Sequence, residues 1–109
     1  MYSDKDFQTI AEMILQIMPM VLKIYLFGSY ARGDAKATSD IDIAIISPEA
    51  MDRKKKMRFI GDLLNNIGGK GFPVEFIIKS SSDFEDEKTL PTLSKAIANE
   101  GRLLWQKNR

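Results

Sequence analysis

The 109-residue sequence contains no cysteine and no histidine. Without cysteine there are no disulfides, no thiolate zinc sites and no cysteine nucleophiles. Without histidine there is no Ser-His-Asp triad and no imidazole metal ligand, and the most common general base is absent. Any chemistry in this chain therefore depends on carboxylates, hydroxyls, lysine, arginine and bound metal ions.

The sequence also lacks a long apolar run and a large excess of one charge. No segment reaches the roughly 20 apolar residues that cross a bilayer, and residues 1–5 show no basic-then-apolar signal pattern. Sixteen basic and fifteen acidic residues give a net charge of +1, which is small for a general nucleic-acid binder. We therefore expect a cytoplasmic protein with no membrane association and no direct nucleic-acid partner.

The composition is that of an ordinary globular protein, with 44% hydrophobic and 28% charged residues. A chain of this length can build one hydrophobic core but not a second lobe. We therefore predict a single domain over residues 1–109.

The apolar spacing predicts helices that alternate with strands. Ser3 and Asp6 resemble a capping box for a first helix that ends near Met18, before Pro19. Further helices are expected at 49–67 and 91–99, strands at 21–27, 41–47 and 72–79, and a short final strand or docking tail at 102–105. This alternation predicts a small α/β domain.

A glycine-serine turn, Gly28-Ser29, follows the first expected strand and leads into a short helical segment closed by Gly33. Free backbone N–H groups, a hydroxyl and the helix dipole at such a turn favour a bound anion. Arg32 lies within one turn and can donate two hydrogen bonds to phosphate oxygens. Neither the Walker nor the dinucleotide-binding glycine motif is present. Taken alone, the dipeptide fits a plain strand-to-helix turn better than a phosphate site.

Two aspartates, Asp40 and Asp42, stand at the head of the next expected strand. Residues two apart in a strand project from the same face, so these carboxylates converge. They repel one another unless they cap helices, pair with basic groups or bind cations. Carboxylate oxygens suit Mg²⁺, and a pair of ions roughly 3.5–4 Å apart assists phosphoryl-type displacement. The alternative is a solvated strand edge.

Glu75 lies inside the third expected strand, between Val74 and Phe76. Burial of a carboxylate is costly unless it meets a cation or lies at an exposed edge. If this strand lies beside the strand of Asp42, Glu75 is a natural third metal ligand.

The motif Gly28-Ser29, ten intervening residues and Asp40-Ile41-Asp42 resembles the signature of nucleotidyltransferases related to DNA polymerase β. Residues 28–33, Gly-Ser-Tyr-Ala-Arg-Gly, and the C-terminal segment 97–105 are similar to the corresponding segments of the minimal nucleotidyltransferases of prokaryotes. The resemblance spans about residues 25–105. It implies an α+β fold, with a small mixed sheet flanked by helices and a site for ATP and Mg²⁺ at one edge.

The resemblance also implies residue roles. Gly28, Ser29 and Arg32 would hold the triphosphate, Asp40 and Asp42 would bind Mg²⁺, with two ions expected, and Glu75 would be the third catalytic carboxylate. In this family the third carboxylate is usually aspartate. The extra methylene of glutamate adds about 1.5 Å of reach, and a misplacement of about 1 Å can cost on the order of 100-fold in rate. This departure bears on how active the enzyme is.

The resemblance further implies a function. The minimal proteins are often antitoxins that transfer AMP from ATP to a tyrosine of a partner HEPN-family toxin, which silences the RNase activity of the toxin. We expect this reaction here, with the toxin as a hetero-oligomeric partner. Two alternatives are a catalytically weak module that neutralises the toxin by occlusion and a nucleotide-sensing subunit.

A run of basic residues, Arg53-Lys54-Lys55-Lys56 with Arg58, opens the second long helix. We expect Met57, Ile60 and Leu64 on the inner face of this helix, which favours a solvated role for the basic residues. Contact with a partner or its bound RNA is the alternative.

Overall fold

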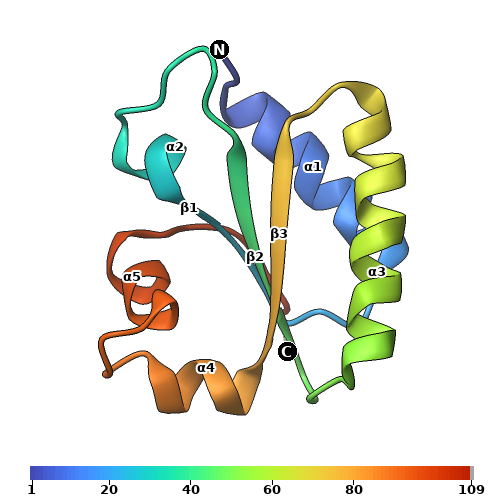
Figure 1. Cartoon of the computed structure of the whole chain (residues 1–109), viewed down its shortest axis with the longest axis vertical. Coiled ribbons are helices and arrows are strands. Elements are labelled where there is room, and N and C mark those ends of the chain that lie inside the picture. The colour runs from blue at the N-terminus through green and yellow to red at the C-terminus, as the bar shows by residue number, and fades with distance from the viewer. Residues whose placement is uncertain (109) are drawn as a thin grey trace.

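The computed structural model describes residues 1–108 as a four-stranded sheet with helices on both faces (Figure 1). The strands are β1 (Lys23–Phe27), β2 (Ile41–Ser47), β3 (Val74–Ser80) and β4 (Arg102–Gln106). Their order is β3-β2-β1-β4, with β2 parallel to β3 and β1 antiparallel to both of its neighbours. The expected fold, a small mixed sheet flanked by helices, is confirmed.

Five helices flank the sheet: α1 (Asp4–Ile17), α2 (Gly28–Arg32), α3 (Arg53–Asn66), α4 (Ser81–Glu87) and α5 (Leu93–Glu100). A short 3₁₀ turn spans Gly68–Lys70. Helices α1 and α3 cover one face of the sheet, and α4 and α5 lie on the other (Figure 1). Helix α2 follows the end of β1, and its Tyr30 is buried in the cluster of α1 and α3. The C-terminal segment pairs with β1, so it is a strand. No helix of residues 1–108 is long and apolar enough to cross a membrane.

The central strand β2 separates two hydrophobic clusters. Its alternate residues Ile41, Ile43 and Ile45 face the larger cluster, with α1 and α3. Ala44 and Ile46 face the smaller cluster, with Phe84 and Ile97 from α4 and α5. Asp42 lies two residues before Ala44 and four before Ile46, so its side chain points to the same face as theirs. The alternation therefore directs its carboxylate to the face covered by α4 and α5.

Helix α4 was not among the helices expected from the sequence. Ser80 caps this helix, because its hydroxyl accepts the backbone N–H of Asp83 at 3.2 Å. Phe84 is buried and its ring stacks on Tyr25 of β1, with ring centroids 5.6 Å apart. Packing of one aromatic side chain thus holds a short helix that has little apolar pattern of its own.

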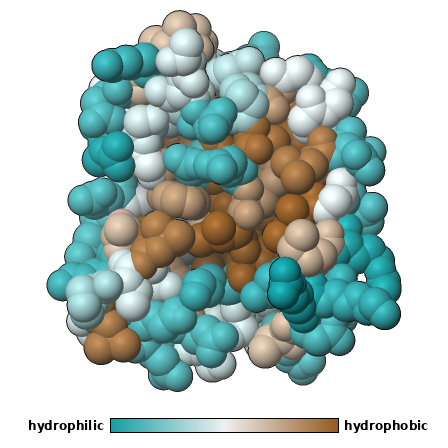
Figure 2. All heavy atoms as spheres, viewed as in Figure 1, coloured by the Kyte–Doolittle hydropathy of each residue, from teal (hydrophilic) through white to brown (hydrophobic). Residues whose placement is uncertain are grey.

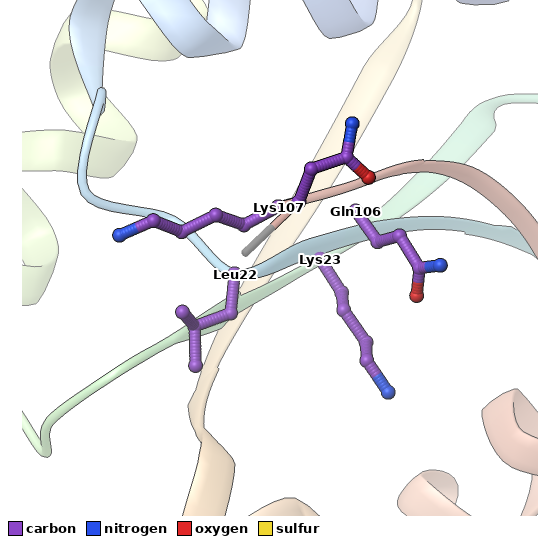
Figure 3. A pocket seen from close by; sticks show the side chains of 5 residues that line it. Leu22, Lys23, Gln106 and Lys107 are labelled. Atoms are coloured by element: carbon purple, nitrogen blue, oxygen red, sulfur yellow. The ribbon is translucent and has the colours of Figure 1, made fainter.

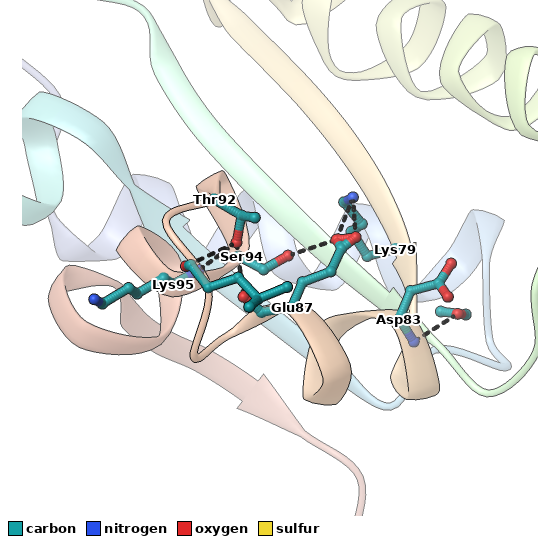
Figure 4. Close-up of polar contacts among 8 residues, drawn as sticks. Lys79, Asp83, Glu87, Thr92, Ser94 and Lys95 are labelled. Atoms are coloured by element: carbon teal, nitrogen blue, oxygen red, sulfur yellow. Dashed lines mark hydrogen bonds and ion pairs between the residues drawn. The ribbon is translucent and has the colours of Figure 1, made fainter.

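A polar network joins β3, α4 and the start of α5 (Figure 4). Lys79 Nζ donates to both carboxylate oxygens of Glu87 at 2.9 Å, and Ser94 Oγ donates to the same carboxylate at 3.4 Å. Thr92 Oγ1 donates to the backbone oxygen of Glu87 at 2.8 Å. Hydrogen bonding to Lys79 lowers the pKa of Glu87. The network anchors α4 and α5 to the sheet face that carries Asp42.

The inner face of α3 differs from the expected one. Leu63 and Ile67 are fully buried, whereas Met57 and Leu64 are 56% and 43% exposed. The expectation that Met57 and Leu64 pack inward was therefore wrong. The reason is that α3 packs next to β3, which is the last strand of the sheet, so one flank of the helix has no neighbouring element. Figure 2 shows apolar side chains gathered over β3 and the adjoining flank of α3.

Candidate active site

The turn from β1 into α2 presents open backbone N–H groups. Phe27 is extended, and α2 then runs for five residues until Gly33, whose N–H donates to Ser29 O at 3.0 Å. No side chain of residues 1–108 caps the first turn of α2. The first N–H groups of a helix have no partner within the helix, so here they can receive an anion. This placement agrees with the phosphate-binding role predicted for Gly28 and Ser29.

Gly28 is required by two separate features of the turn. Its φ of +72° lies in the left-handed region, which side chains disfavour. A Cβ at this position would overlap Oδ2 of Asp42. The sequence indicated a glycine that lets the backbone approach a phosphate. The structure adds that the missing side chain makes room for the Asp42 carboxylate.

Asp42 and Glu75 face each other across the parallel strands. They are direct register partners on β2 and β3, and neighbouring strands lie about 4.8 Å apart. Asp42 is half-buried, whereas Glu75 is exposed on the edge strand. Of the two explanations considered for Glu75 in a strand, a cation or an exposed edge, the structure shows the exposed edge. Because the Glu75 side chain is exposed, a group on another molecule can reach it.

The pKa of Asp42 is raised to about 6. Burial is the largest cause, and the hydrogen bond and negative charge of Glu75 add to it, followed by the charge of Asp40. The positive charge of Arg32 acts in the opposite direction. Asp42 therefore keeps its proton to a higher pH than an ordinary aspartate does.

Asp40 lies just before β2 and is exposed. Its charge reaches Asp42, but no group of three acidic side chains within residues 1–108 lies close enough together to hold a metal ion. The structure thus brings Asp42 and Glu75 together and leaves Asp40 at the approach to the pair. The donor set still suits a divalent cation, because three mutually repelling carboxylates gain from a positive charge and carboxylate oxygens suit Mg²⁺.

Arg32 closes α2 next to this acidic group. Its Nε lies 3.4 Å from Asp34 Oδ2, and both side chains are largely exposed. An exposed ion pair of this kind contributes little free energy, so the guanidinium can exchange Asp34 for a phosphate. The predicted phosphate ligand therefore lies beside the carboxylate pair.

A surface hollow lies away from these carboxylates. It has a volume of about 480 Å³ and is lined by Leu22, Lys23, Gln106, Lys107 and Asn108. It opens at the start of β1, whereas the Gly28 turn follows the end of that strand. Figure 3 shows the side chains of Lys23 and Lys107 pointing in different directions. The two cations therefore do not converge on one anion, and we assign the chemistry to the carboxylate site.

Sequence reasoning missed the contact between Gly28 and Asp42, and it missed α4. The first had no local signal, because the two residues are brought together by strand pairing. Helix α4 did have a local signal, because Ser80 and Asp83 show the spacing of an N-terminal cap.

The sequence matches a known protein family over residues 8–109, the family described as polymerase beta, nucleotidyltransferase. It is 27% identical over 97 residues to the protein adenylyltransferase MntA of Shewanella oneidensis, covering 88% of this chain and 62% of that protein. The chain thus spans less than two thirds of this relative. It is 35% identical over 86 residues to a Methanocaldococcus jannaschii protein named as a candidate protein adenylyltransferase, covering 78% and 79% of the two chains.

Solved structures share the fold. A toxin–antitoxin complex with AMP-PNP contains a chain that matches with a TM-score of 0.64 and 22% identity, over 93% of this chain and 74% of that one. A complex of the tri-AMPylated Shewanella oneidensis HEPN toxin with MNT antitoxin matches with a TM-score of 0.59 and 20% identity, over 96% and 74%. The resemblance indicated by the 28–42 motif is confirmed, and the chain belongs to the polymerase β nucleotidyltransferase family.

Proposed function

We propose that this protein is a Mg²⁺-dependent adenylyltransferase that transfers AMP from ATP to a tyrosine hydroxyl of a HEPN-family toxin and thereby acts as its antitoxin. The observation that carries the proposal is the Asp42–Glu75 pair, which lies directly beside the left-handed Gly28 turn. The names of the relatives, the AMP-PNP complex and the AMPylated toxin complex support it.

The triphosphate would lie at the start of α2. The open N–H groups after Gly28 and the hydroxyl of Ser29 bind phosphate oxygens, and Arg32 donates to them from the end of the same helix. The nucleotide would then lie next to Asp42, because the Asp42 carboxylate occupies the space where a Cβ of Gly28 would be.

Asp40, Asp42 and Glu75 would hold the Mg²⁺ ions. When bound, the ions neutralise the phosphate charge and stabilise the attacking and leaving oxygens. Glu75 is exposed, so it can receive the proton of the acceptor hydroxyl. The acceptor oxygen then forms a bond to the α-phosphorus of ATP, the bond from that phosphorus to the bridging oxygen breaks, and pyrophosphate leaves.

One observation favours a second candidate function. The three carboxylates do not form a closed cluster within residues 1–108, and Glu75 is a glutamate where the family resemblance implies aspartate. A protein with this site could neutralise a toxin by occlusion alone. A nucleotide-sensing subunit is the third candidate, for which ATP would bind without turnover.

Intact-mass spectrometry separates these functions. The protein is co-expressed with the product of the adjacent gene, purified, and incubated with ATP and Mg²⁺. We expect the neighbour to gain one or more AMP masses, with no gain for Asp42→Asn or in the presence of EDTA. A stable complex without any gain would instead support occlusion, and Glu75→Asp would then test whether the longer side chain is the cause.

A further inference from the structure

Strand β3 forms an open edge of the sheet. Its inner side pairs with β2, and no other strand in the described part of the chain pairs with its outer side. An edge of this kind presents unpaired N–H and C=O groups, which can pair with another chain. Proteins usually protect such an edge with a charge, a bulge or a cover.

The flank of α3 beside this edge is apolar. Met57 and Leu64 lie two helical turns apart and therefore on the same side of α3, and they are 56% and 43% exposed. Figure 2 shows that the apolar surface continues from α3 across β3. Contiguous exposed apolar surface of this kind marks an interaction site more often than isolated apolar residues do.

The N-terminal end of α3 carries a concentrated positive charge. Arg53, Lys54 and Lys55 occupy its first turn, Lys56 and Arg58 follow, and the first turn has no acidic residue. None of the five forms an ion pair with an acidic side chain of residues 1–108. The positive end of the helix dipole makes this placement unfavourable in the free protein. A negatively charged partner would remove the penalty.

These features lie along one line that ends at the candidate active site. Because α3 connects the parallel strands β2 and β3, it runs antiparallel to them, and its basic end lies near Ser47 and Ser80. Glu75 lies at the other end of β3, opposite Asp42. At about 3.3 Å per residue, β3 is roughly 20 Å long, and the surface extends along this length.

We propose that the acceptor protein docks on this surface, which consists of the outer edge of β3, the Met57–Leu64 flank and the basic turn 53–58. The docking segment of the partner is apolar and bordered by aspartate or glutamate, and it delivers its hydroxyl to Glu75. The identity of the acceptor rests on the proposed function, whereas the docking surface is defined by its own side chains.

An acidic and apolar protein fits this surface better than other occupants. The phosphate backbone of an RNA would neutralise the basic turn but leave Met57 and Leu64 in water. A second copy of this chain would bring the same five cations to the interface. Only a partner surface with both acidic and apolar side chains neutralises the charge of the basic turn and also covers the apolar flank.

Two double substitutions, each with its own control, test the docking. Arg53→Glu with Lys54→Glu removes the positive charge, and its control is Lys5→Glu with Lys107→Glu, two exposed lysines elsewhere. Met57→Gln with Leu64→Gln removes apolar surface while keeping helix propensity. Its control is Leu103→Gln on β4, where the side chain is 45% exposed. The charge reversal complements the helix dipole, so this variant should melt no lower than the parent chain.

The readout is the affinity for the product of the adjacent gene, measured by calorimetry at low and high salt. We expect each test variant to weaken binding about tenfold or more, as for central interface residues. The charge-reversed variant should also lose salt dependence, and the controls should bind like the parent chain. ATP binding by the isolated variants should not change, because these residues lie outside the nucleotide site.

The outcomes separate docking from catalysis. Weakened binding by the test variants supports the docking surface even if the parent chain transfers no AMP, in which case only the proposed function fails. Equal binding by test and control variants, or no binding by the parent chain, overturns the docking surface. Two other results also overturn it: binding of a 20-nucleotide oligo-U that depends on Arg53 and Lys54 while the neighbour binds normally, and self-association that Met57→Gln with Leu64→Gln abolishes.

Discussion

At the scale of single residues, the site depends on three positions that act on one another directly. Gly28 leaves space for the Asp42 carboxylate, and Glu75 adds to the effect of burial in raising the pKa of that carboxyl. Asp40 and Asp42 were identified from their alternation, and Gly28, Ser29 and Arg32 from the turn. The sequence could not show that Asp42 contacts Gly28, because that contact depends on the pairing of β1 with β2.

Gly28→Ala should damage both stability and activity. Alanine would be strained at a φ of +72°, and its Cβ would displace the Asp42 carboxylate. We expect a loss of about 1–3 kcal/mol of unfolding free energy and a fall in AMP transfer to background, measured by urea denaturation and intact mass. Gly69→Ala is the matched control, because Gly69 has open space around its Cβ position. Parent-like activity of Gly28→Ala would contradict the close contact.

Asp42 should make the free protein less stable as the pH rises. Its folded pKa of about 6 exceeds the unfolded value of about 3.9, so the folded state binds more protons between these values. The contribution of Asp42 to the free energy of unfolding is fully present below about pH 4 and is lost as the pH rises through about 6. Asp42→Asn removes the effect and should gain about 1 kcal/mol over the parent chain at pH 7, allowing for solvent screening of a half-buried pair.

Thermal melts of both proteins from pH 4.5 to 7.5 without metal test this expectation. The difference in Tm between the variant and the parent chain should grow with pH. A constant difference would show that Asp42 does not titrate in this range.

At the scale of elements, the sequence predicted α1 and the first three strands to within a few residues, because their apolar spacing is regular. The predicted cap of α1 is confirmed, since the Ser3 N–H donates to the Asp6 carboxylate at 2.9 Å. Helix α4 was missed because packing of Phe84, rather than periodicity, stabilises it. The inner face of α3 was misplaced because its apolar stripe is wider than the part that the sheet covers.

Glu87→Gln should loosen α4 and α5 without removing the active-site ligands. The substitution weakens the bidentate contact with Lys79 that ties α4 to β3. Because the folded pKa of Glu87 is lowered, its contribution is present at neutral pH and lost as the pH falls through that folded pKa.

Hydrogen exchange of the α4–α5 segment should therefore be faster in Glu87→Gln at pH 7 and converge with that of the parent chain in acid. Glu100→Gln is the control, because Glu100 is an exposed carboxylate at the end of α5. Equal exchange at pH 7 would show that the Phe84 cluster alone holds these helices.

At the scale of the whole molecule, the carboxylate site and the surface along β3 both follow from the position of β3. As the outermost strand, it brings Glu75 opposite Asp42 and also leaves its own outer side open. A partner lying along this edge would meet the site at one end of it.

Mg²⁺ should stabilise the folded chain through the acidic group. We expect a rise in Tm on adding millimolar Mg²⁺ with a non-hydrolysable ATP analogue, since ligands that bind only the folded state stabilise it by mass action. The rise should disappear on adding EDTA and be absent in Asp42→Asn. An equal rise in Asp42→Asn would place the ion elsewhere.

The sequence by itself determined the local features: the kinds of element, the Gly28-Ser29 turn, and the alternation that sets Asp40 and Asp42 on one side of a strand. These follow from backbone preferences and side-chain periodicity within a few residues. The tertiary structure alone decided that Glu75 lies opposite Asp42, that Gly28 touches that carboxylate, and that Met57 and Leu64 remain exposed. Strand order and burial depend on contacts between residues more than ten positions apart in the sequence, which local spacing does not specify.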